Sequence, residues 1–273
     1  MKRVTPESSW PKSWKESYHY DLLEIYGEKT NPGYSSSYAV RKSITLELIK
    51  KSFEPGARIV DVAAAQGNFT LTCAELGYEM TWNDLRAELA DYVRLKHENG
   101  SIDYQPGNVL ELGLEEQFDG VIITEIIEHV AHPDQFLVSI GKLLKPGGRV
   151  VMTTPNGAYF LNRLPRFFDC PDPSIYESQQ FKPNSDGHIF LLYPDEIIEL
   201  SKRAGFKIEN LIHFLTPLTS GHLKLWHLLK FLPPKLVLIL ERLSSKLPLY
   251  LKQKICAQTA CVLIKVTDQI HPL

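Results

Sequence analysis

From about residue 56 onward, short β-branched runs alternate with longer stretches of helical periodicity, and this alternation constrains the fold more than any other feature. Such a pattern is typical of βαβ units, in which helices connect parallel strands. Residues 118–124, FDGVIIT, are apolar almost throughout, as expected for a central strand covered on both faces. The sequence therefore predicts an α/β domain built on a mostly parallel sheet.

Turn and cap residues set the limits of the expected elements, for example Gly77 after a helix and Pro194 before one. Strands are expected at residues 58–62, 79–83, 102–105, 118–124, 149–153, 206–215 and 260–266. Helices are expected at residues 67–76, 86–97, 133–144 and 194–204. The polar stretch 156–186 is longer than a structural connection requires, so we expect it to be functional or mobile.

Composition disfavours several classes of protein. Thirty Lys and Arg against 32 Asp and Glu give a net charge of -2, so no positive field attracts nucleic acid, and we expect no such partner. The first residues carry no apolar run of a secretory signal, and no stretch approaches 18 apolar residues, which favours a cytoplasmic protein. The four cysteines lack a CxxC pair, so we interpret them as reduced thiols, with Cys73 buried in a helix.

Two acids lie where a nucleotide-binding fold places its ligand. Asp61 ends the first strand and precedes a loop and a helix, so a carboxylate lies beside backbone N–H groups, which suits a zwitterionic ligand. Asp84 ends the second strand, where an acid can accept hydrogen bonds from both hydroxyls of a ribose. NAD enzymes also place an acid there, and Asp84 could instead cap the next helix.

The motifs, taken in order, resemble those of class I S-adenosylmethionine-dependent methyltransferases. The segments that carry the resemblance are VDVAAAQGNFT, WNDLR, GNVL, FDGVIITEIIEHVAHP, LLKPGGRVVMTTPN and YPDEIIELSKRAGF. They span roughly residues 56–216 and, as a set, are specific. In pattern they are most similar to the ubiquinone-biosynthesis O-methyltransferases and to methyltransferases of bacterial sugar and surface-polysaccharide pathways.

The resemblance implies a Rossmann-like seven-stranded sheet of order 3-2-1-4-5-7-6 with the last strand antiparallel. S-adenosyl-L-methionine would bind at the carboxyl ends of the strands. Carried over by position, the contacts would be Asp61, Ala63, Ala65 and Gly67 at the methionine part, Asp84 and Leu85 at the ribose, Asn108 and Val109 at the adenine, and Thr124, Glu125 and Ile126 beneath the sulfonium.

Two residues of the first loop depart from the family pattern. Glycine is usual where this chain has Ala63 and Ala65, and alanine adopts a positive φ only at a cost of about 1 kcal/mol. Either these positions have an ordinary φ, or cofactor binding is weakened. Asn108 also stands where an acid is common, although its amide oxygen can still accept from the adenine amino group.

Two histidines are candidate bases for a hydroxyl acceptor. His129 follows the fourth strand, whose carboxyl end should adjoin the transferable methyl group, and His188 lies in SDGHIF. Either imidazole could instead be a structural residue that packs and forms hydrogen bonds. In-line methyl transfer disperses the sulfonium charge, so the protein supplies alignment and a base. No carboxylates show a spacing that indicates a metal site, and we expect none.

The two flanks suggest how an acceptor is held. Residues 1–55 are rich in aromatic side chains and could form a helical lid over the acceptor or pack on the sheet. These aromatic residues are Trp10, Trp14, Tyr18, Tyr20, Tyr26, Tyr34 and Tyr38. Residues 221–257 should form a helical insertion before the last strand, leaving 56–220 as the cofactor-binding core and 258–273 as the final strand and tail.

Within residues 221–255, seven cations accompany one acid, Glu241. Lys224, His227 and Lys230 should share one face of a helix, and Lys235, Arg242 and Lys246 a face of the next, with leucines opposite. These faces could be simply solvated, or could contact anionic lipid or a phosphate-bearing or lipid-linked acceptor at a membrane surface.

Together these features predict an enzyme that methylates a hydroxyl of a small molecule or of a glycan or lipid-linked precursor. An N- or C-methyltransferase shares the same scaffold and stays open. An NAD-dependent enzyme is disfavoured because the Gly-x-Gly-x-x-Gly motif is absent. The two alanines leave a third alternative, a catalytically silent relative that acts as a regulatory partner.

Overall fold

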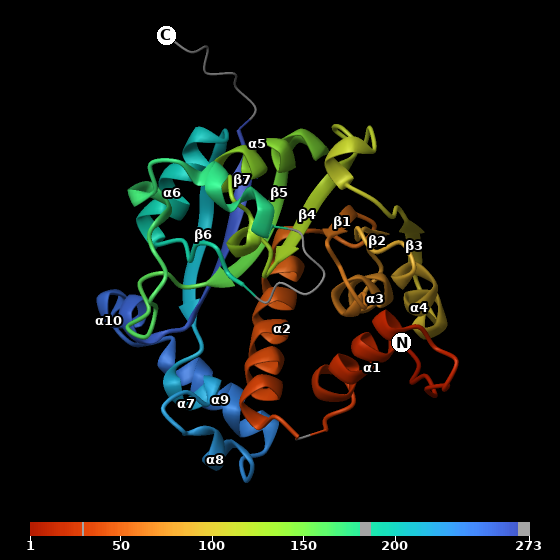
Figure 1. Cartoon of the computed structure of the whole chain (residues 1–273), viewed down its shortest axis with the longest axis horizontal. Helices are drawn as coiled ribbons and strands as arrows, with labels where there is room; N and C mark the ends of the chain where they lie inside the picture. The colour runs from red at the N-terminus through yellow and green to blue at the C-terminus, as the bar shows by residue number, and fades with distance from the viewer. Residues whose placement is uncertain (29, 181–186, 267–273) are drawn as a thin grey trace.

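The computed structural model describes residues 1–28, 30–180 and 187–266, and its centre is one seven-stranded sheet (Figure 1). The strands are β1 (Arg58–Val62), β2 (Glu79–Trp82), β3 (Ser101–Tyr104), β4 (Phe118–Thr124), β5 (Leu144–Pro155), β6 (Phe206–Phe214) and β7 (Gln258–Lys265). Their order is β3-β2-β1-β4-β5-β7-β6. β7 pairs antiparallel with β5 and β6, and the other pairs are parallel. The predicted order and the antiparallel last strand are confirmed.

Helices surround the sheet, and several begin at proline, whose fixed φ suits a first helical turn. The α-helices are α1 (Lys12–Glu24), α2 (Pro32–Ser52), α3 (Asn68–Glu75), α4 (Leu89–Lys96), α5 (Pro133–Leu143), α6 (Pro194–Arg203), α7 (Pro217–Ser220), α8 (Trp226–Leu229), α9 (Pro234–Ser244) and α10 (Leu249–Ile255). Short 3-10 helices are η1 (Val109–Glu111), η2 (Ile127–His129), η3 (Phe167–Asp169) and η4 (Pro173–Gln179).

β4 shows why the sheet is buried on both faces. Val121 and Ile123 belong to one apolar cluster, whereas Ile122 between them belongs to another, because successive side chains of a strand point to opposite faces. All three are fully buried. The apolar run of β4 thus joins the two halves of the core. Cys73 is also fully buried, and the four cysteines are unpaired thiols, as expected.

Two expected segments differ from the structure. β5 begins at Leu144, not at residue 149, because Leu144 pairs with Phe118 and the Pro-Gly-Gly segment enters the strand through a register shift. In the late insertion α8 has only four residues, since Leu223 and Lys224 adopt φ values of 54° and 63° that no α-helix contains. The predicted helical face shared by Lys224, His227 and Lys230 is therefore wrong. Lys246 likewise lies beyond the end of α9.

The flanks meet the core at the edge where the parallel strands end (Figure 1). α2 runs along the sheet, and α7, α8 and α9 pack against α2. The insertion leaves β6 and returns to β7 at this edge, where the backbone N–H of Ala257 donates to the carbonyl of Leu215 at 2.8 Å. Within the described ranges, no helix is both long and apolar enough to cross a membrane. The expected tail and the end of the long polar stretch, residues 267–273 and 181–186, lie outside the described residues.

Candidate active site

The loop between β1 and α3 makes a glycine-type turn with two alanines. Ala63 and Ala65 have φ values of 51° and 48°, and Gly67, which precedes α3, has a φ of 70°. The first alternative, an ordinary φ at the alanines, is therefore wrong. A left-handed conformation costs an L-residue roughly 1–2 kcal/mol. Two hydrogen bonds to the end of β2 hold the loop. Ala64 N donates to Asn83 O at 2.8 Å, and Trp82 Nε1 donates to Ala65 O at 3.0 Å.

Asp61 is almost completely buried at the end of β1. Its Oδ2 accepts hydrogen bonds from the backbone N–H of Thr70 at 3.0 Å and from the Thr70 hydroxyl at 2.6 Å. Burial raises the pKa of Asp61 to about 7. No described residue donates a hydrogen bond to its other oxygen, Oδ1. One oxygen therefore caps α3, and the other can accept from a cationic ligand group.

Asp84 points back to the loop from the end of β2. Its carboxylate accepts from Ala65 N at 2.9 Å, from Arg86 N and Nε at 2.9 Å, and from Arg86 Nη2 at 3.1 Å. Asp84 does not cap α4, which begins at Leu89, so that alternative is wrong. A ribose can reach both carboxylate oxygens only when the Arg86 side chain moves. Leu85, between the two, is half exposed.

The turn GNVL, which was predicted to contact the adenine, forms hydrogen bonds with its own neighbouring residues. Asn108 caps η1, with Oδ1 accepting from Leu110 N at 3.2 Å and Nδ2 donating to Glu111 Oε1 at 2.6 Å. The amide oxygen expected to meet an adenine amino group is thus occupied by the backbone. The Val109 side chain is buried in the core cluster.

Beyond β4 the chain places two glutamates among residues from distant segments. Glu125 has a φ of 56°, and its carboxylate accepts from Thr153 Oγ1 at 3.0 Å, from Gln258 Nε2 at 2.7 Å and from Arg41 Nη1 at 3.1 Å. Glu125 therefore links α2, β5 and β7 to the end of β4. Its neighbours are Thr124, which is partly exposed, and Ile126, which is buried in the core.

Glu128 is fully buried one turn further on. Its Oε2 accepts from Thr154 Oγ1 at 3.0 Å, whereas Oε1 has no hydrogen-bond partner among the described residues. Burial, followed by the charge of Glu125, raises the pKa of Glu128 well above its ordinary value. A bound ion or ligand group is one way in which such a buried polar atom is satisfied.

The structure brings the two candidate histidines together. The ring centroids of His129 and His188 are 5.0 Å apart, and His129 Nδ1 lies 3.2 Å from Gly187 O. A carbonyl oxygen can only accept, so this hydrogen bond places the proton on Nδ1 and leaves the lone pair of a neutral ring on Nε2. His129 is thus oriented as a base, and His188 lies beside it.

Glu128, His129 and His188 offer ligand atoms that all lie within 4.8 Å of one another. One carboxylate and two imidazoles form a donor set that suits a divalent transition metal. Our expectation of no metal rested on spacing along the chain, which does not reveal that His188 lies beside the other two residues. The spacing of Glu125, Glu128 and His129 in EIIEH was the signal available for the first part of this cluster.

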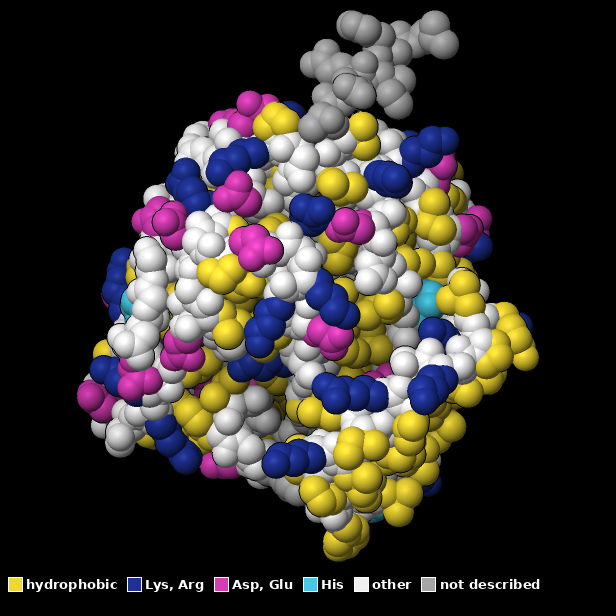
Figure 2. Space-filling view, turned by 180° about the vertical axis from the view of Figure 1, so that it is seen from behind, with side chains coloured by type: hydrophobic (Ala, Val, Ile, Leu, Met, Phe, Trp, Pro, Cys, Tyr) yellow, Lys and Arg dark blue, Asp and Glu magenta, His cyan; other side chains and the backbone are white. Residues whose placement is uncertain are grey.

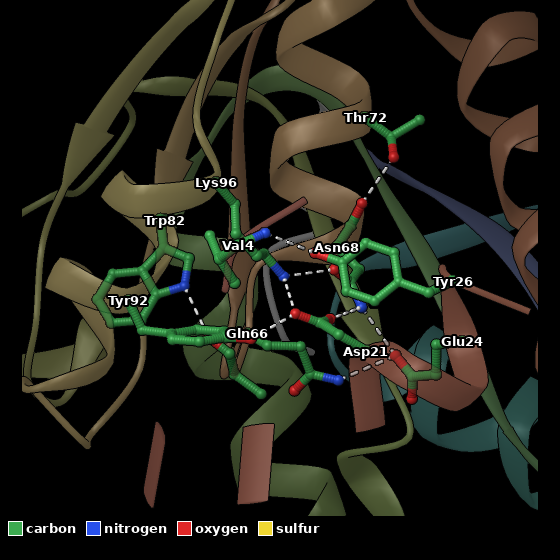
Figure 3. A network of polar contacts seen from close by, with 11 residues as sticks. Val4, Asp21, Glu24, Tyr26, Gln66, Asn68, Thr72, Trp82, Tyr92 and Lys96 are labelled. Atoms are coloured by element: carbon green, nitrogen blue, oxygen red, sulfur yellow. Dashed lines mark hydrogen bonds and ion pairs between the residues drawn. The ribbon is translucent and has the colours of Figure 1, made fainter. Parts of the chain in front are cut away.

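The N-terminal helix α1 is attached to the core by a buried polar network (Figure 3). Asp21 accepts from Lys96 Nζ and from Tyr92 OH, both at 2.7 Å, and from Asn68 Nδ2 at 2.9 Å. Asp21 and Lys96 are fully buried, and breaking a buried ion pair costs roughly 3–5 kcal/mol. Glu24, one turn later, accepts from Gln66 Nε2 at 2.9 Å. The cofactor loop and α1 are therefore rigidly joined.

A cleft of about 840 Å³ lies between α1 and the first loop. Tyr20, Tyr34, Gln66 and Arg86 are among the residues that line it. Five of the seven aromatic residues named for the N-terminal segment thus divide between two roles. Trp10, Trp14 and Tyr18 pack in a cluster with Tyr92 of α4, whereas Tyr20 and Tyr34 face the cleft.

The comparisons with known proteins agree with this geometry. Residues 36–211 match the family model described as a methyltransferase domain. The chain is a class I S-adenosylmethionine-dependent methyltransferase. This methyltransferase is 31% identical over 173 residues to the ubiquinone biosynthesis O-methyltransferase of Xanthomonas axonopodis pv. citri, a match that covers 61% of the chain and 70% of that relative. S-adenosyl-L-methionine is its cofactor, as expected.

Solved structures place this methyltransferase in the same fold. An S-adenosylmethionine-dependent methyltransferase from Mesorhizobium loti superposes with a TM-score of 0.58 at 15% identity, covering 84% of the chain and all of that structure. The [4+2]-cyclase SpnF superposes with a TM-score of 0.54 at 15% identity, covering 94% of the chain and 97% of that structure. Since a cyclase shares this fold, the reaction has to be argued from the side chains of the site.

Proposed function

We propose that this methyltransferase transfers the methyl group of S-adenosylmethionine to a hydroxyl of a small molecule. The orientation of His129 carries the proposal, because Gly187 O holds its Nδ1–H and leaves Nε2 as the proton acceptor at the carboxyl end of β4. The relative from Xanthomonas is named an O-methyltransferase of ubiquinone biosynthesis, which favours oxygen over nitrogen or carbon as the acceptor atom.

The residues around the first loop fit the cofactor. Oδ1 of Asp61 is available to the ammonium group of the methionine part, and Asp84 to the ribose hydroxyls once Arg86 has moved. The left-handed turn at Ala63 and Ala65 exposes the backbone N–H groups of the loop in the manner of a glycine-rich turn. When bound, the cofactor supplies a methyl group on a positively charged sulfur, and that sulfur keeps the electron pair of the broken bond.

The chain's own groups then align the acceptor and move one proton. As the acceptor oxygen bonds to the methyl carbon, Nε2 of His129 accepts the hydroxyl proton. The carbonyl of Gly187 stabilises the imidazolium that forms. Tyr20 and Tyr34 line the cleft beside the cofactor loop, where their rings can stack on a planar group. A glycan or lipid-linked precursor presents the same hydroxyl chemistry and belongs to the proposed range of acceptors.

The cluster of Glu128, His129 and His188 supports a second candidate, metal-assisted transfer. The observation that favours this candidate is the buried Oε1 of Glu128, which has no hydrogen-bond partner among the described residues. A divalent cation held by these three residues would lower the pKa of a hydroxyl group bound to it. Under this candidate Glu128, His129 and His188 would hold the cation, and the cation would position the acceptor hydroxyl.

The proposal is tested by offering the full chain isotopically labelled S-adenosylmethionine and three matched aromatic acceptors, a catechol, an aniline and a hydrocarbon. We expect labelled methyl on the catechol oxygen, located by mass spectrometry and NMR. Label on nitrogen or carbon would overturn O-methylation, and intact S-adenosylhomocysteine binding without any transfer would favour the silent relative. Repeating the assay after dialysis against EDTA, with and without added Mg²⁺, Mn²⁺ or Zn²⁺, separates the metal-assisted candidate from the histidine base.

A further inference from the structure

The insertion at residues 221–257, here called the cap, exposes an unusual amount of apolar side chain. Phe231 is 85% exposed and Tyr250 is 70% exposed. The exposed large apolar residues of the cap are Leu223, Leu228, Phe231, Leu236, Ile239, Leu243, Leu249 and Tyr250. Exposed apolar residues scattered singly need no explanation, but a contiguous group of them marks an interaction site.

The charges that accompany these side chains are all positive. The exposed cations of the cap are Lys224, Lys230, Lys235, Arg242, Lys246 and Lys254. Its one acid, Glu241, is buried and accepts from Leu215 N at 2.9 Å and from the Thr219 hydroxyl. The outer surface of the cap therefore combines apolar and cationic side chains without an exposed carboxylate.

Helix α9 shows the arrangement most clearly. Leu236, Ile239 and Leu243 are spaced by three and four residues and share one exposed face. Lys235 and Arg242, seven residues apart, flank that face, while Val237 and Glu241 lie on the buried side. Figure 2 shows the resulting surface at the lower right, where apolar side chains are bordered by Lys and Arg.

We infer that the outer surface of the cap docks on a membrane that contains anionic lipid. Apolar side chains that enter the headgroup region and cations that contact anionic headgroups are the two components of such binding. A second copy of the chain is disfavoured, because a two-fold interface would bring the same cations face to face. A partner protein would need a surface both apolar and acidic, which an anionic bilayer supplies without a specific sequence.

Docking would also orient the enzyme. The cap connects the end of β6 to the beginning of β7, so it lies at the carboxyl edge of the sheet (Figure 1). The cofactor loop follows β1 and His129 follows β4, so both lie at the same edge. The active-site edge would then lie next to the lipid surface. Docking itself involves no residue assigned to methyl transfer, so its test is independent of the proposed function.

The test is sedimentation of the full chain with vesicles of phosphatidylcholine alone or with 30 mol% phosphatidylglycerol. We expect binding to the anionic vesicles that is at least about tenfold stronger and that weakens with added salt. Phe231→Ser should weaken that binding about tenfold, and Lys235→Glu/Arg242→Glu at least about tenfold.

Matched controls come from another surface of the molecule. Ile198→Ser replaces a half-exposed apolar residue, and Lys202→Glu/Lys207→Glu reverses two exposed cations. These controls should bind vesicles like the natural chain, and every variant should keep its melting temperature and its affinity for S-adenosylhomocysteine. Equal binding to both kinds of vesicle, no binding to either, or equal losses in the cap and control variants would overturn the inference. So would a dimer, seen by light scattering without lipid, that Phe231→Ser dissociates.

Discussion

At the carboxyl edge of the sheet, the acidic residues of the two halves differ in where their hydrogen-bond partners come from. At β1 and β2, one oxygen of Asp61 and both of Asp84 accept from N–H or O–H groups of residues within the same βαβ unit. At β4, β5 and β7, Glu125 is held by three separate segments, and Glu128 keeps an oxygen without a partner among the described residues. The acids of the first half are thus held by residues near them in the sequence, although α1 also bonds to Gln66 and Asn68 of that half, whereas the acids of the second half are held by segments far apart in the sequence.

We infer from this difference that cofactor binding depends mainly on the first half and methyl transfer mainly on the second. A cofactor half made mainly from one βαβ unit can be shared by relatives with different reactions. The half beside β4 depends on α2, on the strand β7 and on the segment around Gly187, each of which can vary independently. Substitutions in the two halves should therefore have distinct signatures, affinity for the cofactor in one and turnover in the other.

The largest effect is expected at His129. We predict that His129→Ala lowers single-turnover rate about 10²- to 10⁴-fold while the affinity for S-adenosylhomocysteine changes little, because a general base contributes to the transfer step alone. His132→Ala is the matched control, since His132 lies near by, is partly exposed and pairs with Glu177 at 2.8 Å. Turnover of His129→Ala at nearly the natural rate would remove the assigned base, and a comparable loss in His188→Ala alone would transfer the role to His188.

The next effect is expected at Asp84. We predict that Asp84→Ala weakens S-adenosylhomocysteine binding at least about tenfold, from the 1.5–3 kcal/mol of hydrogen bonds to a charged group. Asp103→Ala removes an exposed acid at the next strand and should leave the affinity unchanged. Calorimetry on both variants measures the difference. Equal affinities would show that the carboxylate of Asp84 holds Arg86 and the loop but not the ribose.

A pH dependence of similar size is expected from Asp61. With a pKa of about 7, its buried carboxyl is mostly protonated at pH 6 and mostly ionised at pH 8. An ammonium ligand requires the ionised form, so the affinity for S-adenosylhomocysteine should rise about tenfold between these pH values. Asp61→Asn should bind weakly with a flat profile over this range. A rise just as steep in Asp61→Asn would assign the titration to another group.

The same pKa shift has an opposite consequence for the unliganded fold. Because folding raises the pKa of Asp61, its contribution to the free energy of unfolding is greatest below the ordinary pKa of about 4 and declines as the pH rises toward 7. Thermal melts of Asp61→Asn and the natural chain should therefore change relative to one another between pH 4 and pH 7, with the natural chain losing stability. The binding measurement tests whether the cofactor requires the ionised carboxylate of Asp61, and the thermal melts test whether the protonated carboxyl stabilises the unliganded protein.

The smallest effect is expected from the two alanines. Ala63→Gly/Ala65→Gly removes the cost of two left-handed alanines, but glycine also gains freedom in the unfolded chain, so the free energy of unfolding should change by no more than about 1–2 kcal/mol. Cofactor affinity should stay within a few-fold, since the loop already has the required turn. A hundredfold gain in affinity would instead show an impaired site and favour the silent relative.

Local patterns predicted the sheet and its helices because each strand is an apolar run bounded by turn residues. The strand order and the antiparallel last strand came from the resemblance, and the structure agrees. Contacts that join distant segments left no local signal. Asp21 and Lys96 are 75 residues apart and form a buried ion pair. From the sequence alone, each would be interpreted as a separate surface charge. Likewise, His188 lies close to Glu128, which is 60 residues earlier in the chain, and no local pattern indicates this contact.

β6 and β7 are antiparallel neighbours, with Phe214 paired to Gln258. A hydrogen bond from Ala257 N to Leu215 O joins the two ends of the segment between them. In topological terms that segment is the loop of one long hairpin, so its outer surface can change without rerouting any strand, whereas its buried residues Leu229 and Val237 belong to the core cluster that includes β1, β4 and β5. Loops of this kind tolerate insertion, deletion and exchange. A different outer surface can therefore be placed at this one junction, provided that the buried residues of the segment are kept.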